Sequence, residues 1–198
     1  MHKKKIILFI ILVLSLSIVG CQKPKVVSRI SMESPKTGSN MLTYQEDNIK
    51  FTFLFNKPSA IFEGIQNNYS IGLDHPRLSI VNNSDKSIEV NWDKASFINE
   101  DGYVERLING KRKVKNVGEA TLKTQMPSGS KIAEKIIPES NIEVTEYGVM
   151  DGEIANVSKD NDKRKIEKKV SYIIPIIKDG ETKEYRFDIN IFIKAEPQ

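Results

Sequence analysis

Cys21 is the residue whose type and position most clearly predict chemistry. It is the only cysteine of the 198-residue chain, so it can form no disulfide within the chain. It follows an N-terminal segment unlike the rest, with His2 and lysines at positions 3–5 and then an apolar stretch over residues 6–19. In a secreted protein a lone thiol is left free, pairs with another chain or is modified.

The segment before Cys21 has the features of a secretory signal. A basic start, an apolar run and small residues before a cut site are typical of one, and the run is short for a membrane span of roughly 20 residues. The motif Ile18-Val19-Gly20-Cys21 resembles the lipobox of bacterial lipoproteins. That resemblance implies cleavage between Gly20 and Cys21, S-diacylglycerol and N-acyl groups on Cys21, and an anchor of two or three acyl chains. The alternative is an uncleaved signal anchor.

Processing removes most of the chain's apparent basicity. The whole sequence has 30 Lys and Arg against 26 Asp and Glu, a net charge of +4. Residues 1–20 contain three lysines and no acid, so the mature chain has 27 against 26. A near-neutral domain does not favour nucleic acid as a partner. No second apolar segment suggests a further membrane span.

The catalytic inventory of the mature chain is poor, so we expect no enzyme, metal or cofactor. His75, the only histidine after residue 20, stands before Pro76 and is expected at the surface. Sites with several histidine ligands are therefore excluded. The motif Asp160-Asn161-Asp162 lacks the glycine and distant glutamate of a calcium loop. Carboxylates are plentiful, so a polysaccharide-acting enzyme with paired acids remains the alternative.

Two basic clusters stand out on this near-neutral chain. One contains Lys111, Arg112, Lys113 and Lys115, and the other runs from Lys163 to Lys169. They could contact anionic headgroups or an acidic cell-wall polymer. Solvated loop charge that protects strand edges is the alternative.

The elements that must position these residues read as strands. Apolar and polar residues alternate over residues 49–56, 88–93 and 185–194, which predicts half-buried strands. Asp179-Gly180 predicts a hairpin turn, and Pro175 predicts an edge or bulged strand. Residues 21–40 read as a lipidated N-terminus and flexible tether, and residues 41–198 as a single domain. We expect an all-β fold, an antiparallel immunoglobulin-like β-sandwich in preference to a closed barrel.

Residues 78–142 resemble a family of small, functionally uncharacterised bacterial lipoproteins. The resemblance is carried by residues 78–85, by the segment from Ile88 through Trp92-Asp93 and Ser96-Phe97 to Gly102, and by shorter pieces near residues 106, 127 and 137. It implies an extracytoplasmic β-sandwich and assigns no catalytic residue. The physical interpretation of the motif is structural, with Trp92 as a large core residue.

Together these features predict a membrane-anchored extracytoplasmic lipoprotein that acts as a non-enzymatic binding or envelope-assembly module. The expected partners are the membrane, through the lipid, and an envelope protein or a cell-wall polymer. The expected location is the cell membrane or the outer membrane. In a host with an outer membrane, Gln22 stands where an Asp would favour inner-membrane retention, and the lipoprotein resemblance turns this into a preference for the outer membrane. In a host with a single membrane the question does not arise.

Overall fold

The computed structural model describes residues 25–33, 36–38, 40–63, 68–109, 123–145, 148–158 and 165–196. Apart from one short 3-10 turn, Glu139–Asn141, the regular elements in these ranges are β-strands, so the all-β prediction is confirmed. Every strand pairing between them is antiparallel. Over the same residues, no helix has the length and apolar character needed to cross a membrane.

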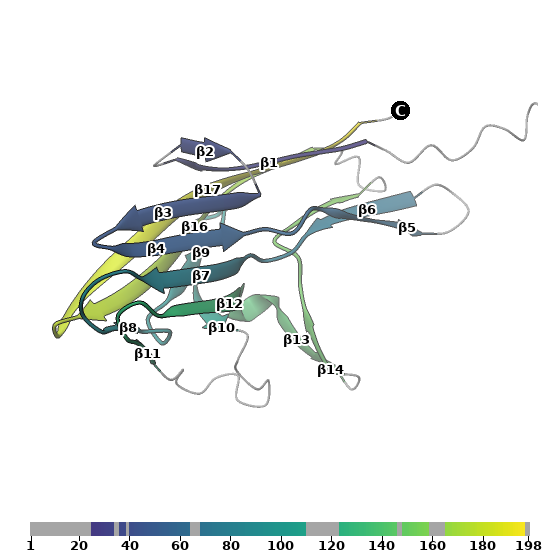
Figure 1. Cartoon of the computed structure of the whole chain (residues 1–198). Helices are drawn as coiled ribbons and strands as arrows, with labels where there is room; N and C mark the ends of the chain where they lie inside the picture. Colours follow the sequence, from purple (N-terminus) through teal and green to yellow (C-terminus); the bar gives the residue numbers. More distant parts are fainter. Residues whose placement is uncertain are drawn as a thin grey trace, which may run out of the picture.

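Most strands belong to one sheet (Figure 1). Its main path is β2 (Lys36–Gly38), β1 (Lys25–Glu33), β17 (Glu181–Glu196), β16 (Lys165–Lys178), β9 (Ser96–Ile98), β10 (Val104–Asn109), β12 (Lys131–Pro138), β7 (Arg77–Asn82), β4 (Ile49–Leu54) and β3 (Met41–Glu46). Off this path, β8 (Ile88–Val90) pairs with β16 and with β11 (Thr124–Met126). Two small sheets contain β13 (Ile142–Thr145) with β14 (Gly148–Asp151), and β15 (Ala155–Ser158), β6 (Asn68–Leu73) and β5 (Ser59–Glu63).

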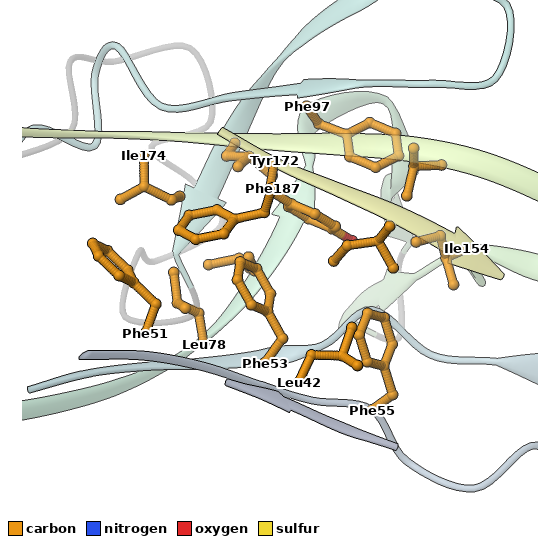
Figure 2. Close-up of a cluster of buried hydrophobic side chains, with 14 of the residues drawn as sticks. Leu42, Phe51, Phe53, Phe55, Leu78, Phe97, Ile154, Tyr172, Ile174 and Phe187 are labelled. Carbon is orange, nitrogen blue, oxygen red and sulfur yellow. The ribbon is translucent and has the colours of Figure 1, made fainter. Parts of the chain in front are cut away.

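The main sheet curls so that its two halves face each other. Figure 2 shows Phe51 and Phe53 of β4 reaching across the core toward Tyr172 of β16 and Phe187 of β17. The ring centroids of Phe53 lie 4.9 Å from Phe187 and 5.4 Å from Tyr172. Because the halves are joined through the β10–β12 pairing, the architecture is barrel-like and differs from a sandwich of two separate sheets. The sequence pattern could not separate these two cases, since both bury alternate residues.

The alternating segments form the strands predicted for them, and their apolar side chains make the core. In β17, Ile189, Ile191 and Ile193 are fully buried, while the residues between them face outward. Trp92 is also fully buried, and its Nε1–H donates to Thr124 Oγ1 at 2.9 Å. This bond satisfies the one polar group of the indole.

The flexible tether predicted over residues 21–40 does not hold for residues 25–33, which form β1. This strand pairs with β17 from Lys25↔Glu196 to Met32↔Ile189. Ile30 and Met32 are buried, so the domain begins well before residue 41. The strand has only a few apolar residues in a polar stretch, but a ladder with β17 supplies the pairing that such a segment cannot provide for itself.

The prediction of an edge or bulged strand at Pro175 is also wrong. The residue lies inside β16, which has β17 on one side and β8 and β9 on the other. On that second side, β9 pairs with β16 as far as Ile173, and β8 pairs from Ile176 onward. Proline therefore stands at the change of neighbour, where its carbonyl accepts from Asn91 N at 3.0 Å and its missing N–H breaks no ladder.

Candidate functional site

The predicted anchor lies outside the described residues. This holds for the lipobox with Gly20 and Cys21, and for the basic cluster at residues 111–115. The second cluster is described only in part, because Lys163 and Arg164 fall outside while Lys165, Lys168 and Lys169 lie on β16. These three residues are therefore the part of the basic clusters that the structure can place.

His75 is buried, so the expectation of a surface histidine is wrong. Its side chain is 3% exposed, and its ring packs edge-on against Phe97 with centroids 6.3 Å apart. The Asp-His-Pro motif follows β6, and the turn directs the imidazole into the core in place of the solvent. In the described ranges, no group of three or more His, Cys, Asp or Glu residues could hold a metal ion.

The feature best suited to binding is a cleft of about 450 Å³ at one end of the barrel. It lies between the turn that joins β3 to β4 and the hairpin end of β16 and β17, at the left of Figure 1. Its lining is Asp47, Asn48, Ile49, Ile176, Lys178, Asp179, Glu181, Lys183 and Tyr185. The buried side chains of Ile49 and Ile176 give it an apolar floor.

Two tight turns shape the cleft. Asp47 and Asn48 have φ of 52° and 60°, and Asp179 and Gly180 have φ of 53° and 81°. Positive φ at both central residues characterises the type I′ turn, which matches the twist of a two-residue hairpin. The hairpin predicted at Asp179-Gly180 is thus confirmed. The Asp47-Asn48 turn is not predicted from the sequence, although both residue types tolerate positive φ.

A polar cluster ties these two hairpins together. Lys183 Nζ lies 2.6 Å from Asp47 Oδ2 and 2.8 Å from Glu46 Oε1. The Tyr185 hydroxyl donates to the same Asp47 oxygen at 2.9 Å, and the Tyr44 hydroxyl donates to Glu46 Oε2 at 2.5 Å. We call these five residues the Lys183 clasp. It joins groups that lie about 140 positions apart in the sequence.

The clasp keeps its groups in their ordinary protonation states at neutral pH. The hydrogen bond from Lys183 lowers the pKa of Asp47, with help from Tyr185, and lowers the pKa of Glu46, with help from Tyr44. Their carboxylates in turn raise the pKa of Lys183. Burial, followed by the bond to Asp47, raises the pKa of Tyr185. A general acid or base works best with a pKa near the operating pH, and every one of these shifts leads away from it.

The cleft therefore suits binding better than acid–base chemistry. Its rim carries both signs of charge on Lys178, Asp179 and Glu181, above an apolar floor. Asp179 also forms an ion pair with Lys86, whose Nζ lies 2.8 Å from Asp179 Oδ2. The sequence predicts the Asp179-Gly180 turn but not the clasp, because no local pattern relates Lys183 to the residues around position 47.

Comparison with known proteins adds no relative. No family model matches the chain, and no curated protein matches it at a significant level. The resemblances to lipoproteins therefore stay predictions that rest on the residues quoted for them.

Proposed function

We propose that this chain is a lipid-anchored extracytoplasmic protein whose β domain binds a partner or forms part of an envelope assembly without catalysing a reaction. The observation that carries the proposal is the motif Ile18-Val19-Gly20-Cys21 directly after a basic and apolar leader. Lipidation accounts for the lone cysteine, and a stable anchor needs the two or three acyl chains that such a modification supplies.

The fold is consistent with a module of this kind. β1 begins at Lys25, four positions after Cys21, so little chain separates the sheet from the anchor. Apolar side chains fill the barrel, and the cleft opens at its far end with charged groups on its rim. The cleft offers a surface to an envelope protein or a cell-wall polymer. The chain itself would be anchored in the cell membrane or the outer membrane.

Lipid labelling tests the anchor. In cells fed labelled palmitate, the wild-type chain should incorporate label and be shortened by the leader, whereas Cys21→Ala should remain an unlabelled precursor. A matched control is the double variant Cys21→Ala with Ser31→Cys, which restores one thiol outside the motif and should also remain unlabelled. Label on either variant would contradict modification at Cys21.

Two further assays separate binding from catalysis. When the protein is purified from solubilised membranes, the same envelope component should be recovered with it in repeated experiments. The variant Glu181→Lys, which changes the cleft, should no longer recover that component. The matched control is Glu184→Lys, an equally charged change three positions along β17 and outside the cleft lining. Turnover of cell-wall glycans by the purified protein would instead support the alternative of a polysaccharide-acting enzyme and refute a purely non-enzymatic role.

A further inference from the structure

We propose that one outer face of the sheet, at the end where β1 begins and β17 ends, lies against the headgroups of anionic phospholipids. We call it the basic face and define it by Val27, Arg29, Lys165, Lys169, Phe192 and Lys194. The inference rests on the proposed lipid anchor at Cys21 and deepens it, because it states which surface of the domain meets the membrane.

The basic face is the part of the domain next to the anchor. β1 and β17 are antiparallel, so Lys25 pairs with Glu196 and the two strand ends lie side by side (Figure 1). An extended chain spans at most about 3.6 Å per residue, so Cys21 lies within about 14 Å of Lys25. Charges beside β1 are then held within one or two Debye lengths of the bilayer surface, where headgroup charge still acts.

The strand register brings the side chains of this face together. Lys194 lies directly between Val27 of β1 and Lys165 of β16. Two positions along the strand, Phe192 lies directly between Arg29 and Glu167. Directly opposed residues point to the same side of a sheet. The fully buried Ile191 and Ile193 occupy the alternate positions, so the whole set points away from the core.

The charge on this face has one sign in excess. Arg29, Lys165, Lys169 and Lys194 are exposed, and the acids among the described outward side chains here are Glu167, 3.1 Å from Lys165, and Asp188, which interacts with Lys169. Lysines placed directly opposite each other, as Lys165 and Lys194 are, destabilise a sheet. An anionic surface facing both lysines would turn this repulsion into attraction.

The face also has apolar surface between its cations. Phe192 and Val27 are half-buried, and Lys165 Nζ lies 5.3 Å from the centroid of the Phe192 ring. Long basic side chains commonly extend to headgroups while their stems and a neighbouring aromatic ring face the apolar side of the interface. Cations around an aromatic residue beside an anchor therefore match a headgroup layer better than open solvent.

Single-cysteine labelling tests the orientation, because Cys21 is consumed by lipid and an introduced cysteine is then the only free thiol. Asn190→Cys lies beside the basic face and Thr182→Cys lies on the same side of β17, eight residues or about 26 Å away. Each full-length lipidated variant carries a fluorophore and is reconstituted into vesicles of phosphatidylglycerol and phosphatidylcholine with spin-labelled headgroups. We expect strong quenching at position 190 and little at position 182.

Charge reversal supplies the decisive control. Lys165→Glu with Lys194→Glu should reduce quenching at position 190 to the level at position 182. Each lysine raises the equilibrium constant for contact with an anionic surface about fivefold, so losing two lowers that constant about 25-fold. Lys50→Glu with Lys131→Glu makes the same charge change on exposed positions of β4 and β12 and should leave quenching unchanged. Vesicles of phosphatidylcholine alone should reproduce the effect of the first double variant. Thermal unfolding monitored by circular dichroism checks that both variants fold.

The outcomes separate this inference from the proposed function. Mass spectrometry of the purified chain shows whether Cys21 carries lipid. If it does, equal quenching at the two positions, or quenching indifferent to the charge reversal, overturns the basic face alone. If Cys21 carries no lipid, the anchor fails and the membrane-facing surface fails with it.

Discussion

Replacing Asn82 by alanine should destabilise the domain strongly, because this one side chain joins the loop after β7 to the turn between β11 and β12. It is fully buried, and its Nδ2 donates to the carbonyls of Lys86, Met126 and Pro127 at 2.8, 3.0 and 3.1 Å. Its Oδ1 accepts from both the amide and the hydroxyl of Ser84, at 3.0 and 2.6 Å.

The size of the effect follows from what the substitution leaves behind. The Ser84 amide and the Met126 carbonyl make buried bonds to Asn82, and alanine removes both. A buried polar group left without a partner costs about 1–3 kcal/mol, so Asn82→Ala should lower the free energy of unfolding by roughly 2–6 kcal/mol. That is a large part of the 5–15 kcal/mol that domains typically have, as an order of magnitude.

Urea unfolding followed by the fluorescence of Trp92, the only tryptophan, measures this change directly. The experiment uses the chain from Gln22 onward, which contains every described strand. Asn83→Ala is the matched control, because Asn83 is exposed and the hydrogen bond from its backbone N–H to the Asn48 carbonyl survives the substitution. We expect Asn83→Ala to stay within about 0.5 kcal/mol of wild type. Equal unfolding midpoints for the two variants would refute the role assigned to Asn82.

Three further predictions concern the clasp, a turn and the first strand. Lys183→Met should make the melting temperature fall less steeply in acid. Lys183 lowers the pKa values of Glu46 and Asp47 below their ordinary values of 4.5 and 3.8. The stability that these carboxylates contribute is therefore present above the ordinary values and is lost as the pH falls through the lowered pKa values. Melting curves of both proteins from pH 7 to pH 2 would show parallel profiles if the clasp contributed nothing. Gly180→Ala should cost about 1–2 kcal/mol in urea unfolding, because φ is 81° at this position, and an unchanged midpoint would contradict the assigned turn. Ile30→Ala should cost about 2–5 kcal/mol while Ser31→Ala stays within about 0.5 kcal/mol, whereas a flexible tether would make both changes neutral in the same assay.

The sequence predicted the strands well wherever one face of a strand meets the core. The segments with Phe51 and Phe53, and with Phe187 and its neighbours, alternate strictly, and these side chains interlock in the core. Such a pattern fixes which face is buried but not which strand lies beside which. The joining of the two halves through β10 and β12, and hence the barrel-like form, depends on pairings between distant segments.

The candidate cleft was harder to predict for the same reason. The dipeptides Asp47-Asn48 and Asp179-Gly180 carry local turn signals, because they adopt positive φ readily. The ion pairs of Lys183 depend instead on two hairpins meeting at one end of the barrel, and no spacing in the sequence reports that meeting. His75 illustrates the converse, since a residue beside a proline in a polar motif can still be turned into the core.

β1 connects the least predictable part of the fold with the proposed function. Because β1 pairs along its length with β17, the proposed anchor at Cys21 would be joined to the sheet by residues 22–24 alone. The strand direction of β16 and β17 places their turn, and with it the cleft, at the end of the domain opposite the start of β1 (Figure 1). The end of β17 and its turn are separated by about 15 residues, or roughly 50 Å of strand. Under the proposed anchor, a partner at the cleft would therefore contact the domain at the end opposite the lipidated residue.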